Sequence, residues 1–287
     1  MILVTGAGGK TGIAVVRSLL INNHGVRILV LDESKIRDLE FVDDVEVVIG
    51  DMRSESVQRD AFDGVRSVYH ICPNMHEDEL AIGLSMISIA KQFDIKHFVY
   101  HSVLHPQIED MPHHWQKMRV EEAIFVSDLP YTIMQPAAYM QNVLMEKARI
   151  YEDKFIHVPY SIDSKGSPVN LDDVAEVAAT VLSKQDYIGG IYELCGPEIL
   201  TPKDQASTLG SHIGIELTIQ QITLDQWKLQ NNLSNFSTYA LKSLVDMFVY
   251  YDKYGFWGSS YVLESLLGRK PTGFSEFVER YFDKFNL

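Results

Sequence analysis

Short apolar runs alternate with longer amphipathic stretches through the first 135 residues. Each run is apolar throughout and rich in β-branched residues, which is typical of strands buried on both faces of a parallel sheet. The stretches between the runs have helical length, so the pattern predicts a doubly wound α/β fold with helices on both faces of one parallel sheet. The expected strands are Ile2–Thr5, Arg27–Leu31, Val45–Ile49, Ser67–Ile71, His97–His101 and Tyr131–Met134. The expected helices are Thr11–Asn22, Ser56–Phe62, Glu77–Phe93 and His114–Phe125.

The alternation weakens after Pro136. One more helix is expected at Asp172–Ser183, and a seventh strand near Ile191–Cys195. From Thr201 onward the chain reads as mostly helical, with aromatic clusters near its end that suit a lobe core, the wall of an apolar pocket or a partner surface. Right-handed crossovers between parallel strands then favour the sheet order 3-2-1-4-5-6.

Composition and charge narrow the class of protein. Apolar residues make up 46% of the 287 positions and charged residues 22%, which is typical of a globular chain with a full core. The net charge of −14 disfavours nucleic acid as a partner, and no apolar run approaches the roughly 20 residues that span a bilayer. The first residues lack the basic segment of a signal peptide. Two distant cysteines, Cys72 and Cys195, fit reduced thiols, and we expect a cytoplasmic protein.

A glycine-rich loop, TGAGGKTG at residues 5–12, follows the first expected strand and opens the first helix. Its GxxGxxG spacing permits a tight turn and close approach of a pyrophosphate to the backbone, as in dinucleotide-binding Rossmann folds. A P-loop is the rival interpretation, but its first glycine would fall at Val4, inside the strand. A purely structural turn is the remaining alternative. The residues expected to contact the dinucleotide here are Gly6, Gly8, Gly9, Lys10, Thr11 and Gly12.

Together with the strand–helix alternation, the loop predicts a dinucleotide-binding Rossmann domain at residues 1–135 plus about 169–195. A smaller, mainly helical lobe for a substrate or partner is expected at 136–168 and 196–287. Asp32 ends the second strand about 20 residues after the loop, where a carboxylate binds the adenosine ribose hydroxyls and repels a 2′-phosphate. The sequence therefore favours NAD(H), although a turn-forming role for Asp32 is the alternative. Lys10, Lys35 and Arg37 would offset the repulsion, so NADP(H) stays open. Adenine is expected near Asp51 and Met52, after the third strand.

Several further segments occur together in one known family. They are Tyr100-His101-Ser102, His113-x-x-x-Lys117-x-x-x-Glu121, Leu129-Pro130-Tyr131-Thr132, Pro136-Ala137-Ala138-Tyr139-Met140-Gln141-Asn142 and Leu171-Asp172-Asp173-Val174-Ala175. With the glycine loop, they make the chain similar to the NmrA-like branch of the atypical short-chain dehydrogenases/reductases, from Met1 to about Leu217. That branch includes quinone oxidoreductases, triphenylmethane-dye reductases and redox-sensing regulators. This chain carries Leu31 where NADP-binding members often have Arg, and it lacks the Arg that members commonly have near Gln135.

The resemblance also implies an active site. The wider superfamily uses a Tyr and a Lys one helical turn apart, and here His113 and Lys117 hold those positions. Lys117 would bind the nicotinamide ribose, His113 would donate a proton, and Ser102 would polarise the substrate. For these three residues the structural alternatives are a solvated lysine, a surface histidine and a strand-end cap. Other residues expected beside the cofactor are Ile71, Cys72, Pro136 and Tyr139, with Asn142 near the nicotinamide unless this loop simply packs on the lobe.

Three functions compete for this pattern. The first is an NAD(P)H-dependent reductase of a quinone-, dye- or carbonyl-like acceptor, for which a strong acid is less essential. The second is a non-catalytic dinucleotide sensor that acts through a regulatory protein partner, and the third is a nucleotide-sugar epimerase or dehydratase, which needs the missing tyrosine. Five histidines between His97 and His114 match no zinc spacing, so no metal is expected.

Overall fold

A computed structural model describes residues 1–36, 39–234 and 236–283, so Arg37 lies outside the described residues. The chain divides into two compact units. The first unit comprises Met1–Gln135 and Val174–Tyr192, and the second comprises Pro136–Asp173 and Glu193–Leu287.

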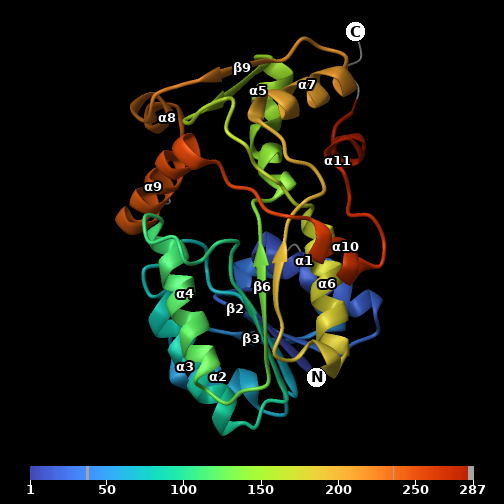
Figure 1. The fold of residues 1–287 in the computed structure, drawn as a ribbon. Helices are drawn as coiled ribbons and strands as arrows, with labels where there is room; N and C mark the ends of the chain where they lie inside the picture. Colours follow the sequence, from blue (N-terminus) through green and yellow to red (C-terminus); the bar gives the residue numbers. More distant parts are fainter. Residues whose placement is uncertain (37–38, 235, 284–287) are drawn as a thin grey trace. The chain divides into compact units, whose positions relative to one another are not determined.

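A seven-stranded sheet forms the centre of the first unit (Figure 1). Its strands are β1 (Ile2–Thr5), β2 (Val26–Val30), β3 (Glu46–Ile49), β4 (Ser67–His70), β5 (His97–His101), β6 (Tyr131–Pro136) and β8 (Ile191–Leu194). The order is β3-β2-β1-β4-β5-β6-β8, and neighbours from β3 to β6 pair in parallel, with Ile2 opposite Val26. The predicted order and fold class are therefore confirmed, with β1 inside the sheet, where both of its faces are buried.

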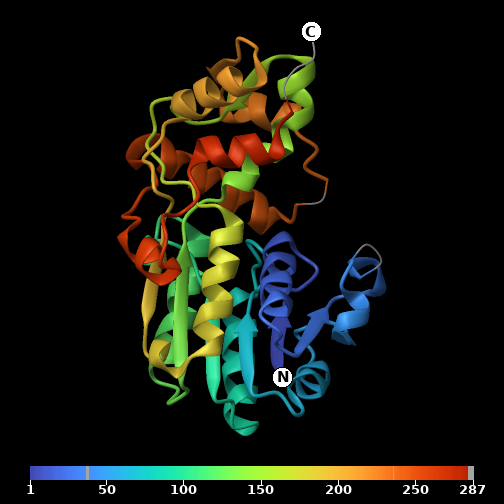
Figure 2. The same ribbon diagram turned by 90° about the vertical axis from the view of Figure 1, so that its right-hand side faces the viewer.

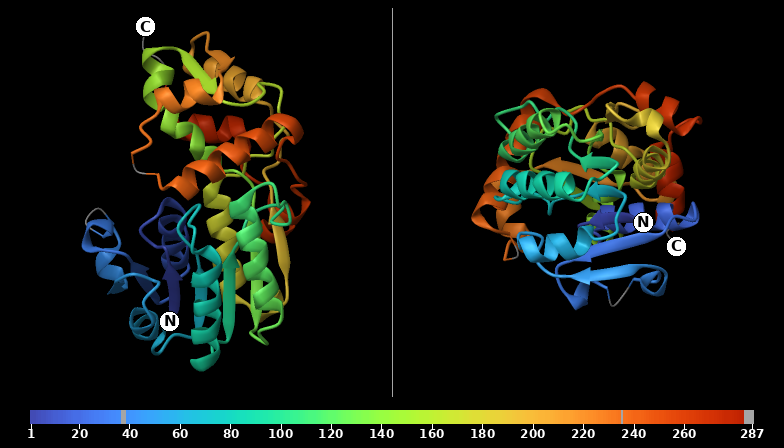
Figure 3. Two further views of the ribbon diagram at one scale, coloured as in Figure 1. Left: turned by 90° about the vertical axis from the view of Figure 1, so that its left-hand side faces the viewer. Right: turned by 90° about the horizontal axis from the view of Figure 1, so that it is seen from below.

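Helices cover both faces of this sheet, with α2, α3 and α4 on one face and α1 and α6 on the other (Figure 1). These helices are α1 (Lys10–Ile21), α2 (Glu55–Phe62), α3 (Glu79–Gln92), α4 (Pro112–Phe125) and α6 (Leu171–Ser183). Helices α3 and α4 lie side by side (Figure 3): a Cβ added at Gly83 would lie 2.6 Å from a methyl carbon of Val120. On the opposite face, α1 and α6 are neighbours (Figure 2). His24 Nε2 and Ser183 Oγ, 2.8 Å apart, link the chain just beyond α1 to the end of α6.

The second unit holds a small parallel sheet and most of the remaining helices. Its elements are η3 (Met140–Glu146), α5 (Lys147–Glu152), β7 (Phe155–Val158), α7 (Pro202–Ile213), β9 (Thr218–Gln221), α8 (Leu224–Gln230), α9 (Thr238–Tyr254), α10 (Tyr261–Leu267) and α11 (Phe274–Tyr281). Strands β7 and β9 pair in parallel, with Phe155 opposite Thr218. The sequence did not reveal β9, because it is four residues long, polar and mostly exposed, and its partner lies some 60 residues earlier.

Among the described residues, no helix is long and apolar enough to cross a membrane.

Candidate cofactor and catalytic site

The backbone of the glycine loop has a conformation and close contacts that residues with side chains would not permit. Gly6 has φ of +61°, and a Cβ at Gly12 would lie 2.5 Å from the Gly6 carbonyl oxygen. Gly9 caps α1 with no side-chain hydrogen bond, and no acidic residue lies in the first turn. The positive dipole end of α1 therefore meets no acidic side chain from its own first turn, and a helix start of this kind suits a phosphate. Burial lowers the pKa of Lys10 at the start of the same helix.

Thr5 joins the ends of β1 and β4 beside this loop. Its hydroxyl donates to the Ile71 carbonyl at 3.0 Å and accepts from the Ile71 amide at 2.9 Å. A Cβ at Gly6 would lie 2.8 Å from the same carbonyl. The backbone of Ile71 therefore forms one wall of the loop, where a contact with the cofactor was expected.

Asp32 makes local hydrogen bonds in the structure. Its carboxylate accepts hydrogen bonds from the Ser34 amide at 2.8 Å and from the Ser34 hydroxyl. Asp32 thereby caps the short helix η1 (Glu33–Lys35). This is the turn-forming role that was the alternative. The stem of Lys35 lies against Gly8, with its Cβ 2.8 Å from where a glycine Cβ would be. The aliphatic part of a lysine thus lies beside the loop, and ribose binding by Asp32 stays a prediction.

Asp51 is engaged by Arg53. Arg53 Nη2 lies 2.6 Å from Asp51 Oδ2, and this contact holds the pKa of the Asp51 carboxyl below its usual range. The Met52 carbonyl accepts from Gln58 Nε2 at 2.6 Å, which ties this turn to α2. Adenine binding at Asp51 and Met52 remains a prediction.

Lys117 is buried at 8% exposure and held by two acceptors on other elements. Its Nζ donates to Glu79 Oε1 on α3 at 3.0 Å and to the His101 carbonyl on β5 at 3.3 Å. The Tyr100 hydroxyl also donates to Glu79 Oε1, at 2.7 Å. An ammonium has three N–H donors, so one remains for a ligand. Lys117 is therefore a buried, oriented cation, which removes the alternative of a solvated lysine.

Ser102 lies directly beyond β5 and is bound to a second buried carboxylate. Its hydroxyl is hydrogen-bonded to Glu121 Oε1, and Gln135 Nε2 donates to both Glu121 oxygens at 2.9 and 3.0 Å. Burial is the main cause that raises the pKa of Glu121. Glu121 follows Lys117 by four residues, so both lie on one buried face of α4.

His113 precedes Lys117 by four residues on this same face and is also buried. Its Nδ1 is buried without a hydrogen-bond partner among the described residues. Burial, with smaller contributions from His114 and Lys117, lowers the pKa of His113 to about 2. The ring is therefore neutral at physiological pH and has no imidazolium proton to give, so proton donation by His113 remains a prediction without support from its protonation state.

Cys72 and the residues after β6 complete the predicted set. Burial and the charge of Glu79 raise the pKa of the Cys72 thiol, which makes this side chain a buried hydrophobic group rather than a nucleophile. Pro136 ends β6 and begins the second unit, where Tyr139 is bridged to Val169 and its carbonyl accepts from the Asn142 amide at 3.1 Å. Their expected contacts with a cofactor remain predictions.

Sequence reasoning missed Glu79 as a site residue and did not assign a role to Glu121. Glu79 belongs to another helix and is the last of three consecutive acidic residues before a mostly apolar segment, so no local pattern distinguishes it. Glu121 carried a clearer signal, because its spacing from Lys117 places both on one helix face. In the described ranges, no three His, Cys, Asp or Glu side chains are grouped so that they could hold a metal ion.

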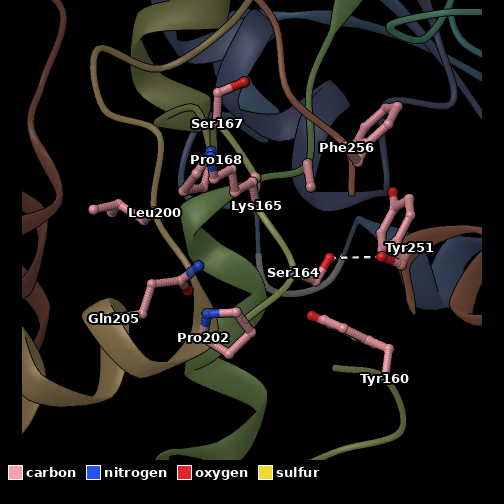
Figure 4. Close-up of a pocket in the computed structure, with 12 residues that line it drawn as sticks. Tyr160, Ser164, Lys165, Ser167, Pro168, Leu200, Pro202, Gln205, Tyr251 and Phe256 are labelled. Atoms are coloured by element: carbon pink, nitrogen blue, oxygen red, sulfur yellow. Dashed lines mark hydrogen bonds between the residues drawn. The ribbon is translucent and has the colours of Figure 1, made fainter. Parts of the chain in front are cut away.

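The second unit contains a small pocket of its own (Figure 4). Tyr160, Tyr251 and Phe256 form its aromatic wall, and Ser164 Oγ donates to the Tyr251 carbonyl at 2.6 Å. Burial raises the pKa of Tyr160 to about 12. The pocket holds about 70 Å³, far below the roughly 300–1,000 Å³ typical of ligand sites. As it stands, it is too small for a substrate site.

Known proteins are similar to this chain in sequence and in fold. An NAD(P)H azoreductase from Xenophilus azovorans is 30% identical over 233 residues, which cover 79% of each chain. Quinone oxidoreductase 2 from Escherichia coli strain K12 is 24% identical over the whole length of both proteins. The structure of an NADPH-dependent quinone oxidoreductase from Escherichia coli, complexed with NADPH, matches with a TM-score of 0.85 at 24% identity, covering 99% of this chain and 100% of the other. A Citrobacter sp. triphenylmethane reductase complexed with NADP(H) matches with a TM-score of 0.84 at 22% identity, covering 98% and 100%.

The family comparison covers nearly the whole chain. The sequence model of the NmrA-like family matches residues 1–278, which span the glycine loop, α4 with its buried polar face, and the helices of the second unit. The predicted resemblance is thus confirmed and extends well beyond Leu217. The chain belongs to the NmrA-like family.

Proposed function

We propose that this protein is an NAD(P)H-dependent oxidoreductase that reduces a quinone-, azo- or dye-like acceptor. The observation that carries the proposal is the buried ammonium of Lys117, fixed by Glu79 and the His101 carbonyl with one N–H left for a ligand. Support also comes from relatives named as an NAD(P)H azoreductase and a quinone oxidoreductase.

The residues of the first unit fit a dinucleotide. Gly6 and Gly12 let the loop backbone pack closely at the start of α1, where the helix amides would hold a pyrophosphate. Lys117 would donate to the nicotinamide ribose, and the unpartnered Nδ1 of buried His113 would gain a hydrogen bond from the same ligand. When bound, a reduced nicotinamide supplies a hydride, that is, two electrons and a proton. The chain's part is to bind, orient and exclude water.

The acceptor class follows from the missing tyrosine. His113 stands in its place and is neutral, so no strong acid comes from this position. An acceptor that delocalises negative charge after reduction, such as a quinone or an extended azo dye, needs less acid assistance than a simple ketone.

A steady-state assay tests the proposal directly. NADH and NADPH oxidation would be followed against a panel of quinones, azo dyes and triphenylmethane dyes, and binding of both dinucleotides would be measured by calorimetry. We expect turnover with at least one acceptor class. Dinucleotide binding without any turnover would overturn the reductase proposal.

A dinucleotide sensor with a regulatory protein partner is the second candidate. The neutral His113 in place of the tyrosine favours it, as does a fold shared with a negative transcriptional regulator complexed with NAD, at a TM-score of 0.79 and 18% identity. NAD(H) preference is also a proposal and rests on Asp32 and Leu31. Buried, unpaired Cys72 and Cys195 support a reducing, cytoplasmic location.

A further inference from the structure

Glu121 is a buried carboxyl without a cation of its own. It exposes 2% of its surface, and among the described residues no Lys, Arg or His nitrogen lies within ion-pair distance of its oxygens. Its hydrogen-bond partners are the neutral Ser102 and Gln135. Gln135 offers the carboxyl a neutral amide, which does not balance its charge as a guanidinium would. A buried carboxylate with neutral partners is costly to ionise.

The charged and titratable groups that face Glu121 do not change this picture. The hydrogen bonds from Ser102 and Gln135 lower the pKa of Glu121, and so does the charge of Lys117 one turn earlier on α4. The ammonium of Lys117 is already paired with Glu79 at 3.0 Å. Burial is the main cause that raises the pKa of the Tyr100 phenol on β5, followed by Glu79, and Glu121 contributes least. Burial outweighs these effects, and the pKa of Glu121 is raised.

The protonation of Glu121 decides where the Ser102 hydrogen points. A serine hydroxyl has one hydrogen, and an ionised Glu121 binds it, leaving Ser102 unable to donate to anything else. A protonated Glu121 donates its own hydrogen to Ser102 Oγ, and the serine hydrogen is released toward another acceptor. The oxygen positions are the same in both states.

We infer that Glu121 carries a proton in the resting protein and supplies it through Ser102 to the reduced acceptor, in place of the missing tyrosine. This inference rests on the proposed reductase function. Ser102 is the group that touches the acceptor, and Glu121 acts through it.

Two coupled proton transfers complete the reduction. The acceptor gains two electrons and a hydrogen as hydride and becomes an anion. Ser102 gives its hydroxyl proton to that anion while Glu121 Oε1–H gives its proton to Ser102 Oγ, so that the serine stays neutral and Glu121 becomes the carboxylate. Once the reduced product leaves, water returns a proton to Glu121 along the same hydroxyl.

Infrared spectroscopy of the protein without acceptor tests the protonation. A protonated carboxyl has a carbonyl stretch distinct from that of a carboxylate, and Glu121→Gln assigns the band. We expect this band at neutral pH in the unsubstituted protein. Gln135→Arg introduces a cation and should abolish the band at neutral pH, whereas Gln135→Met removes a donor and should preserve it to higher pH. A matched control is Glu122→Gln, which removes a neighbouring carboxyl on the exposed side of α4.

Turnover provides the second readout. Glu121→Gln and Ser102→Ala should each lower kcat about a hundredfold, with dinucleotide Kd unchanged within about twofold and no further loss in the double variant. Gln135→Arg should lower kcat at neutral pH and shift the alkaline limb of its pH profile, where Glu121 loses its proton, to lower pH. A missing Glu121 band at neutral pH, or an unchanged pH profile in Gln135→Arg, would overturn the inference. If no acceptor is reduced at all, the reductase proposal fails, and the infrared band still decides the protonation of Glu121.

Discussion

The two units differ in the kinds of side chain that they bury. The interior of the first unit contains an ammonium, two carboxyls and five neutral histidines, among them Lys117, Glu79 and Glu121. The main core of the second unit is built from hydrocarbon side chains such as Ile156, Leu209 and Phe277. Buried groups that titrate link folding to pH, whereas buried hydrocarbon does not. The polar interior of the first unit therefore supplies groups for chemistry, and it also makes the stability of that unit depend on pH.

Lowering the pH should reduce the stability of the first unit far more than that of the second. Burial lowers the pKa to about 4 for His70, His97 and His114, to about 3 for His101 and to about 2 for His113. The unfolded chain, with a histidine pKa of about 6.5, binds more protons in this range, so stability is full above that pH and is lost as pH falls toward 4. At pH 5 the loss is about 2 kcal/mol for each histidine.

Single-tryptophan variants would separate the two responses. Trp115 reports on the first unit and Trp227 on the second, so urea unfolding followed between pH 7 and 5 should show a falling midpoint for Trp115 and a nearly constant one for Trp227. His113→Phe removes one buried imidazole, so the urea midpoint reported by Trp115 should fall less steeply with pH, by the contribution of one proton. Equal pH sensitivity of both reporters would contradict the comparison.

Breaking the Lys117–Glu79 pair should have the next largest effect. Lys117→Met leaves a buried carboxylate without its cation, which costs about 3–5 kcal/mol of unfolding free energy. It should also weaken dinucleotide binding roughly tenfold to a hundredfold, because a charge-assisted hydrogen bond contributes about 1.5–3 kcal/mol. The double variant Lys117→Met with Glu79→Leu should regain most of the stability and none of the binding. Recovery of binding in the double variant would show that Lys117 has only a structural role.

A core truncation in the second unit sharpens the contrast. Phe277 is fully buried in the cluster between α7 and α11, so Phe277→Ala should cost about 3–4 kcal/mol. The loss should be equal at pH 7 and pH 5, since no proton is involved. Chemical denaturation at both pH values, read through Trp227, measures it. A loss that changes strongly with pH would mean that the second unit also couples folding to protons.

The smallest expected effect concerns Asp32. A carboxylate near a 2′-phosphate in high dielectric contributes about 1 kcal/mol, so NADH should bind about fivefold tighter than NADPH. Asp32→Ala should narrow that ratio, and calorimetry with both dinucleotides measures the change. Equal or tighter NADPH binding by the unsubstituted protein would mean that Lys35, packed on Gly8, dominates over Asp32.

The strand positions and sheet order could be read from the sequence because both are local or nearly so. Runs such as Ile2–Thr5 are apolar on both faces, and crossover handedness leaves few orders for strands joined by helices. The pairing of β7 with β9 could not be read in this way, since it joins two short, half-exposed segments far apart in the chain.

The sequence alone determined the glycine loop and the helix face that carries His113, Lys117 and Glu121, because backbone sterics and the helical repeat act over a few residues. Only the tertiary structure decided their chemical states. Glu79 reaches Lys117 from a neighbouring helix, Gln135 reaches Glu121 from a strand, and the packed core takes water away from His113. Charge and protonation depend on desolvation and on partners brought from distant parts of the chain, and no local pattern contains either.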